Sequence, residues 1–187
     1  MAGVGIVFFI ADDGIHGMEL WKSDGTAAGT SLVEDITPGL DANGRPAGSN
    51  LVLLGVLNGR LLFGVGYETP GGLWASDGTE AGTRRVSDVN PVGFAQLGGG
   101  PLPLGDAVEL KGRLFFGGGT ATSGGLFASD GTVAWTTLVK ESRSSGDNPG
   151  PGRGHELWSS DGTTAGTRLV KDINAIPPLP PADVDSG

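Results

Sequence analysis

The chain contains no cysteine, which excludes disulfide bonds, thiolate zinc sites and a cysteine nucleophile. Basic residues are also scarce: 12 Lys and Arg stand against 21 Asp and Glu in 187 residues, for a formal net charge of -9. A chain of this charge repels phosphate backbones, so nucleic acid is not expected as a partner. No apolar run approaches the ~20 residues of a membrane span, so membrane insertion is not expected either.

Residues that could carry catalysis are few. The two histidines, His16 and His155, each lack a second histidine at ligand spacing, and no Gly-x-Ser-x-Gly elbow occurs. The glycine runs 98–100 and 117–119 lack the helix start and the Lys-Ser/Thr pair that a phosphate loop needs. We therefore predict no catalytic residue, no bound cofactor and no enzymatic activity.

Glycine and proline, by contrast, are abundant, with 36 and 12 residues. Without a period such a composition is typical of disorder, but here it recurs within an internal repeat and predicts turns. Four segments align on an aromatic residue with spacings of 53, 53 and 31 residues. The aligned aromatic residues are Trp21, Trp74, Phe127 and Trp158.

Each aromatic residue is followed two positions later by Ser-Asp-Gly-Thr, 12 positions later by valine and 14 positions later by an acid. The Asp-Gly pairs are Asp24 and Gly25, Asp77 and Gly78, Asp130 and Gly131, and Asp161 and Gly162. The acids are Asp35, Asp88, Glu141 and Asp172. In such a turn Asp accepts a backbone N–H two residues on, and Gly takes the left-handed conformation.

The pattern between the aromatic residues is that of β-strands. Residues 51–57 and 60–65 are apolar runs joined by Asn58-Gly59, a pair typical of a two-residue hairpin turn. Residues 107–110 and 113–116 repeat this hairpin around Lys111-Gly112. A third strand carries the aromatic residue, and a fourth follows the Ser-Asp-Gly-Thr turn. Each full unit is therefore predicted to be a four-stranded antiparallel meander that must pack on its neighbours.

The run from Glu19 to Thr26 (ELWKSDGT), followed by Ala28-Gly29-Thr30 and residues 32–39, closely resembles the bacterial ELWxxDGT repeat family. The resemblance covers nearly all of residues 6–173. It implies a propeller-like repeat module of large exported or surface-associated bacterial proteins, with no established activity.

From the strand pattern and the family resemblance together, we predict an all-β, β-propeller-like array of four-stranded blades, incomplete at about three and a half repeats. An open stack of β-sheets is the alternative. Residues 1–174 form one repeat domain, with repeats at about 6–39, 50–93, 104–143 and 153–174. The expected strands number three, four, four and two in these repeats, so closure into a ring is awkward. A fragment of a longer array, or a degraded copy of one, is favoured.

Several parts of the chain depart from the repeat pattern. Residues 142–154 form a polar loop in place of the last copy's first two strands, and the Pro-rich tail 175–187 is predicted to be disordered. Residues 6–10 are expected to form a strand, and residues 1–11 are not expected to be a signal peptide, since no basic n-region or cleavage site is present. Trp135 stands where other copies have a turn glycine, which we expect to need φ > 0, so a different hairpin conformation is predicted there.

The carboxylates and aromatics offer few sites. Rings of repeated acids, or Asp12 and Asp13 in a calcium-like turn, are candidate ligands for a hard cation such as Ca2+, but turn capping is the stronger expectation. The four aligned aromatic residues could stack on sugars if exposed, although packing between sheets is favoured.

The sequence therefore predicts a non-catalytic scaffold or a binding and adhesion surface, and the family resemblance implies that it belongs to a bacterial exported or cell-surface protein. A protein or glycan ligand is possible, and exposed strand edges favour self-association. The alternatives are a fragment of a propeller hydrolase or lyase, with His16 and His155 as an acid/base pair, and a calcium-stabilised adhesion module.

Overall fold

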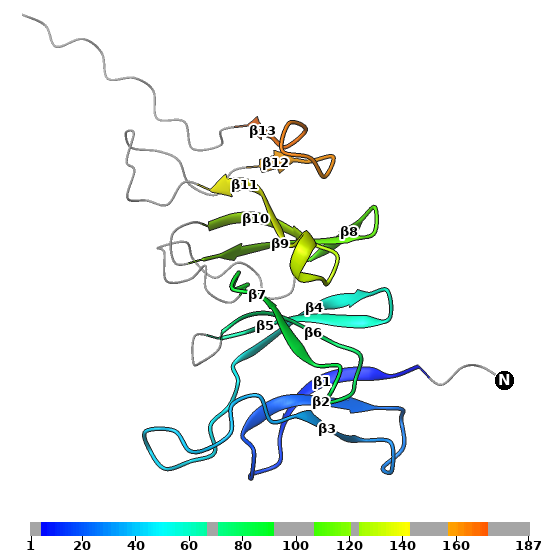
Figure 1. Ribbon diagram of the computed structural model, residues 1–187, viewed down its shortest axis with the longest axis vertical. Coiled ribbons are helices and arrows are strands. Elements are labelled where there is room, and N and C mark those ends of the chain that lie inside the picture. Colours follow the sequence, from blue (N-terminus) through cyan, green and yellow to red (C-terminus); the bar gives the residue numbers. More distant parts are fainter. Residues whose placement is uncertain (1–4, 67–70, 92–106, 121–123, 143–156, 172–187) are drawn as a thin grey trace, which may run out of the picture.

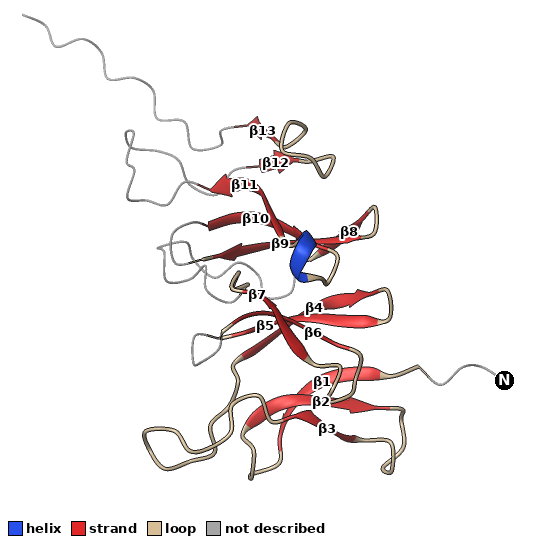
Figure 2. Ribbon diagram, in the orientation of Figure 1, coloured by secondary structure: helices blue, strands red, loops and turns tan. Residues whose placement is uncertain are grey.

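The structure is a computed structural model, which describes residues 5–66, 71–91, 107–120, 124–142 and 157–171. These residues form antiparallel β-sheets and one short 3-10 helix, Val133–Trp135 (Figure 2). The predicted all-β class is confirmed. No helix among the described residues has the length and apolar character needed to cross a membrane.

The strands group into four sheets in chain order (Figure 1). The first sheet contains β1 (Val7–Asp12), β2 (Met18–Ser23) and β3 (Ser31–Glu34). The second contains β4 (Leu51–Leu57), β5 (Arg60–Val65), β6 (Gly72–Ser76) and β7 (Arg84–Ser87). The third contains β8 (Val108–Leu110), β9 (Arg113–Gly119), β10 (Gly124–Ser129) and β11 (Thr137–Ser142). The fourth contains β12 (Leu157–Ser159) and β13 (Arg168–Lys171).

Within the described residues, the sheets therefore hold three, four, four and two strands, as the sequence predicts. Every pair is antiparallel and joins strands that are consecutive in the chain. The described strands do not close into a barrel or a propeller. The predicted loop, apart from its first residue, and the whole predicted tail lie outside the described residues.

The two predicted hairpin turns adopt the expected conformation. Asn58 and Gly59 have φ of 52° and 76°, and Lys111 and Gly112 have φ of 53° and 74°. Two successive residues at positive φ give the turn twist that matches a pair of antiparallel strands. Local turn chemistry thus sets the register of β4 with β5 and of β8 with β9.

The strand with the aromatic residue pairs with the next strand through the same β-bulge in all four sheets. The register shifts between the leucine and the aromatic residue, at Leu20/Trp21, Leu73/Trp74, Leu126/Phe127 and Leu157/Trp158. The extra residue opposite each shift is the repeated valine of the motif, at Val33, Val86, Val139 and Val170. A bulge bends the strand and strengthens its twist, so the valine spacing is a structural part of each sheet.

The core lies between successive sheets. The cluster between the first and second sheets consists of Leu20, Val33, Ile36, Leu51, Leu61, Phe63, Val65 and Trp74. The cluster between the second and third consists of Leu57, Leu62, Leu73, Ala75, Val86, Val89, Leu114, Phe116 and Phe127. A third cluster, Phe115, Ala128 and Val139, covers the opposite face of the third sheet. Alternate residues of each strand thus face the sheet before and the sheet after, which gives the row of sheets in Figure 1.

Candidate functional site

The Ser-Asp-Gly-Thr turn is the polar feature that recurs in all four sheets. In the second sheet, Oδ1 of Asp77 accepts hydrogen bonds from the backbone N–H and the hydroxyl of Thr79, at 3.0 and 2.7 Å. The Ser76 hydroxyl accepts the N–H of Gly78 at 2.9 Å and lies 2.7 Å from the Thr83 hydroxyl. The Thr83 hydroxyl donates to the carbonyl of Thr79 at 2.7 Å. Each polar side chain of the motif therefore closes the turn itself.

The other three copies build the same turn. Asp24, Asp130 and Asp161 accept from the threonine two residues on at 2.7–2.9 Å. The glycines that follow, Gly25, Gly78, Gly131 and Gly162, have φ between 86° and 90°. The predicted roles of Asp as acceptor and Gly in the left-handed conformation are both confirmed.

The second glycine of the motif is explained by close approach and not by positive φ. A Cβ built on Gly29, Gly82 or Gly166 would overlap the carboxylate of Asp24, Asp77 or Asp161, and none of these glycines has positive φ. The predicted reason for glycine at this place was therefore wrong. In the third sheet, Trp135 takes this place and ends a 3-10 helix that directly follows the intact Ser-Asp-Gly-Thr turn. The predicted change of conformation is confirmed, and it is consistent with the glycine copies, where the carboxylate fills the space that a side chain at this place would need.

These bonds also favour the charged form of the turn carboxylates. The pKa of Asp24, Asp77 and Asp161 lies below its ordinary value, first because of the threonine hydroxyl and then because of the threonine N–H. Arg60 adds a smaller effect on Asp77, with its Nη2 at 3.9 Å from Oδ2. These three carboxylates are thus stabilised as anions by the turns they close.

The acids 14 residues after the aromatic residue do not form a common feature. Asp35 and Asp88 lie just beyond the ends of β3 and β7, while Glu141 lies within β11. Oδ1 of Asp35 is buried and makes no hydrogen bond within the described chain, and Oδ1 of Asp88 accepts only from the adjacent Ser87, at 3.4 Å. Neither of these two oxygens therefore bonds a neighbouring turn. Asp172 lies outside the described residues.

The turn between β1 and β2 holds the first histidine. Asp13 Oδ2 lies 2.7 Å from Nδ1 of His16, and its Oδ1 accepts the N–H of Ile15 and of His16, both at 2.9 Å. These bonds, with the His16 backbone N–H as the largest cause, lower the pKa of Asp13 to about 2. The bond to Asp13 raises the pKa of His16 above its ordinary value. Asp12 caps the same turn by accepting the N–H of Gly14 at 2.7 Å.

Asp12 and Asp13 therefore act as turn-capping residues in this geometry. Across the described part of the chain, no three His, Cys, Asp or Glu side chains gather where they could hold a metal ion. Calcium dependence stays a prediction. His155, the other proposed half of an acid/base pair, lies outside the described residues.

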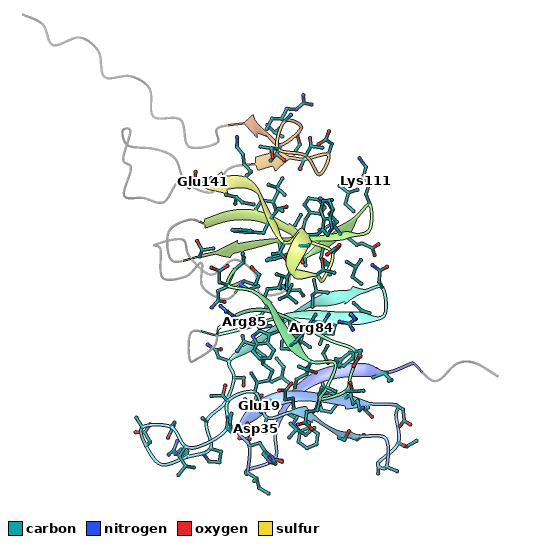
Figure 3. The ribbon with its side chains drawn as sticks, viewed as in Figure 1. Glu19, Asp35, Arg84, Arg85, Lys111 and Glu141 are labelled. Atoms are coloured by element: carbon teal, nitrogen blue, oxygen red, sulfur yellow. The ribbon has the colours of Figure 1, made fainter. Side chains whose placement is uncertain are left out.

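A buried carboxylate, Glu19 of β2, is the polar centre that sequence reasoning missed. It is fully buried, and its Oε1 accepts a 2.5 Å hydrogen bond from the hydroxyl of Ser49. Its Oε2 accepts the N–H of Ile36, and the Thr37 hydroxyl lies 2.8 Å from that of Ser49. Burial is the main cause that raises the pKa of Glu19, and the charge of Asp35, its neighbour in Figure 3, adds to it.

This network ties the segment between β3 and β4 to the edge of the first sheet. Ser49 also donates its backbone N–H to the carbonyl of Met18, at 3.0 Å. The signal for it was present in the alignment, because the positions equivalent to Glu19 in the next two copies are glycines, Gly72 and Gly125. A charged residue that replaces glycine in a buried strand indicates a partner brought from elsewhere in the chain.

The aligned aromatic residues of the second and third sheets are buried against the preceding sheet. Trp74 and Phe127 are 8% and 3% exposed, and their rings lie 6.4 and 6.3 Å from Phe63 and Phe116 on the neighbouring strand. Trp21 is half-buried, and its Nε1 is shielded with no hydrogen-bond partner in the described structure. The backbone of Trp158 is described in β12, but its side chain is not.

An exposed aromatic residue occurs instead at Trp135, which is 53% exposed. The guanidinium of Arg113 lies 5.2 Å from its ring centre, a cation–π contact.

No family model matches the chain, and neither curated proteins nor solved structures give a match.

Proposed function

We propose that the chain is a non-catalytic repeat module that serves as a scaffold or binding surface of a bacterial exported or cell-surface protein. The observation that carries the proposal is the recurrence of one hydrogen-bonded turn in four successive sheets. In each copy, one carboxylate oxygen and three hydroxyls are used to close the turn. The polar residues of the repeated motif therefore stabilise the sheets themselves, which is the expected use of a motif in a repeat protein.

The packing supports the same proposal. Each interior sheet buries one side of its strands against the preceding sheet and the other side against the next. Such units depend on their neighbours for a core, as the units of repeat proteins do. The row of sheets in Figure 1 favours the open stack over a propeller-like ring, in which the first and last sheets would have to meet. Small-angle scattering distinguishes the two, because an open row gives a larger maximum dimension than a ring of the same mass.

The function is tested at the cell surface and in an activity screen. Cells that express the full protein are treated with an external protease, and loss of this segment from intact cells is the expected result. Beads coated with the chain are then assayed for adhesion to cells and to polysaccharides. Full protection from protease in intact cells, with digestion only after lysis, would overturn the surface assignment.

A hydrolase or lyase is the second candidate, and the 2.7 Å contact between Asp13 and His16 is the observation in its favour. Turnover of chromogenic esters, glycosides and polyuronates is measured for the unaltered chain and for His16→Asn. We expect no turnover in either. Turnover that His16→Asn abolishes would replace the scaffold proposal with the enzyme.

A calcium-stabilised adhesion module is tested by thermal melting. A melting temperature that rises with millimolar calcium would favour this module, and an unchanged melting curve would remove it.

A further inference from the structure

The outer face of the first sheet carries the side chains that the next two sheets bury against the sheet before them. Strand register makes Val7, Phe9 and Trp21 equivalent to the residues of β5 with β6 and of β9 with β10. The equivalent residues are Leu61, Phe63 and Trp74 in the second sheet, and Leu114, Phe116 and Phe127 in the third. The first sheet therefore presents the packing surface of an interior sheet on a face with no described sheet against it.

Exposure separates this face from its buried equivalents. Val7 is 62% exposed, whereas Leu61 and Leu114 are 3% and 4% exposed. Phe9 and Trp21 are half-buried, whereas their counterparts in the second and third sheets are buried. The difference lies in what covers the sheet, since all these residues are large and apolar and the strand register is the same.

The turn glycines show the same difference in a second set of contacts. A Cβ built on Gly78, Gly131 or Gly162 would lie 3.1–3.4 Å from Phe8, Leu62 or Phe115 of the preceding sheet. Those three contacted residues occupy equivalent positions, opposite Lys22, Ala75 and Ala128 in their sheets. A Cβ on Gly25 would have nothing within 4 Å. The turn of the first sheet thus lacks the contact that each other turn makes.

The opposite end of the row leaves the complementary surface open. The bulge valine faces the following sheet, and it is 5%, 3% and 6% exposed at Val33, Val86 and Val139. Val170 of the fourth sheet is 54% exposed. One end of the row therefore exposes the face that receives a preceding sheet, and the other end exposes the valine that packs on a following sheet.

We propose that the outer face of the first sheet binds the fourth sheet of a second copy of this chain, head to tail. The face is Val7, Phe9, Trp21 and Gly25, and the opposing surface centres on Val170. The argument for a second copy is internal: successive sheets join through these two surfaces, so the chain carries both halves of its own joint. A head-to-tail joint is heterologous and extends into linear assemblies when its rotation does not close a ring.

The inference rests on the proposed scaffold function and names its partner. Burial of apolar side chains drives the joint, whereas the net charge of -9 on each copy opposes it. Added salt screens this repulsion, so association is expected to tighten as ionic strength rises. Pairing through ion pairs would show the reverse dependence.

Sedimentation velocity of the full chain over a range of concentrations tests the joint. The variants are Val7→Glu and Val170→Glu, which place a charge on either half, and the control is Val133→Glu, at a side chain that is 72% exposed elsewhere. We expect the unaltered chain and the control to form concentration-dependent oligomers. Each single variant should associate about 100-fold more weakly, because the new carboxylate would be buried without a partner. Circular dichroism checks that each variant is folded. If Val7→Glu does not fold, Val7→Ser is used in its place.

Mixing the two variants gives the decisive result. Val7→Glu keeps an intact fourth sheet and Val170→Glu keeps an intact first sheet, so the mixture should form one-to-one dimers that grow no further. A mixture that stays monomeric overturns the head-to-tail joint. If the single variants associate as strongly as the unaltered chain, the copies pair through their strand edges, and this result also overturns the head-to-tail joint. A monomeric chain that still adheres to cells overturns this inference alone and leaves the scaffold function standing.

Discussion

The carboxylate of Asp77 occupies the space in which a side chain on Gly82 would have to lie. The same relationship holds between Asp24 and Gly29 and between Asp161 and Gly166. Because Asp77 accepts both the N–H and the hydroxyl of Thr79, it cannot move aside without losing these bonds. The glycine and the aspartate of the motif are therefore one structural unit.

Gly82→Ala is expected to destabilise the chain by about 1–3 kcal/mol, the usual cost of forcing extra atoms into a packed site. Urea unfolding followed by fluorescence measures this loss. The control is Gly5→Ala, where a Cβ would meet nothing within 4 Å, and which should change stability by about 0.5 kcal/mol or less. The cost of Gly82→Ala should shrink in an Asp77→Ser background. An equal cost in both backgrounds would contradict the steric account.

The buried hydroxyl pair of the second sheet gives a separate prediction. Ser76 is fully buried and Thr83 is 7% exposed, and their hydroxyls lie 2.7 Å apart. Thr83→Val is expected to cost about 1–3 kcal/mol, because the Ser76 hydroxyl loses the acceptor for its proton away from water. Thr30→Val removes the same pair in the half-buried turn of the first sheet and should cost less, since water can replace the hydroxyl. Thermal melting of both variants makes the comparison, and equal losses would count against the role of burial.

Acid should weaken the fold through the turn carboxylates. The folded-state pKa of Asp24, Asp77 and Asp161 lies below the unfolded value of 3.8. Their stabilising contribution is therefore present above pH 3.8 and is lost as pH falls through the lowered folded-state pKa. Asp13, whose pKa is about 2, loses its contribution over the interval from 3.8 down to that value.

The variant Asp77→Asn tests this dependence, because asparagine still accepts the N–H of Thr79 but does not titrate. We expect its melting temperature to fall less steeply below pH 4 than that of the unaltered chain. The two slopes come from melting curves recorded at several pH values. Parallel slopes would show that Asp77 does not contribute to acid sensitivity.

Glu19 should act with the opposite sign. Burial raises its folded-state pKa above the unfolded value of 4.5, so the folded state holds this proton more tightly. Its contribution to stability is greatest below pH 4.5 and falls as pH rises through the raised folded-state pKa. The stability of Glu19→Gln relative to the unaltered chain should therefore increase over that interval. Chemical unfolding on both sides of it gives the comparison, with the exposed Glu109→Gln as the control for loss of one charge. A pH-independent difference would contradict a buried, titrating Glu19.

Features that depend on a few neighbouring residues were predicted well. The Asn58-Gly59 and Lys111-Gly112 hairpins, the Asp and Gly roles in the repeated turn, and the number of strands in each sheet all follow from local backbone chemistry. The altered turn at Trp135 was also predicted, although its reason was not. The overlap between Gly82 and Asp77 spans five residues and depends on where the turn folds the carboxylate.

The polar centre at Glu19 could not be predicted with its partners. Ser49 lies 30 residues further along the chain, in a segment whose path depends on how the first two sheets pack. The bulge at each repeated valine, and the ends of β3 and β7 before Asp35 and Asp88, were likewise missed. An alternating apolar pattern assigns a face to each residue only while the register is unbroken.

The printed residues were enough to predict four sheets of antiparallel strands and the turns within them, because those choices rest on φ preferences and on hydrogen bonds a few residues apart. The order in which the sheets pack, the half-exposure of Trp21 against the burial of Trp74, and the exposure of Val170 were decided only in three dimensions. Equivalent residues differ there because burial depends on what lies against a sheet, and the same motif in each copy carries no information about its neighbour.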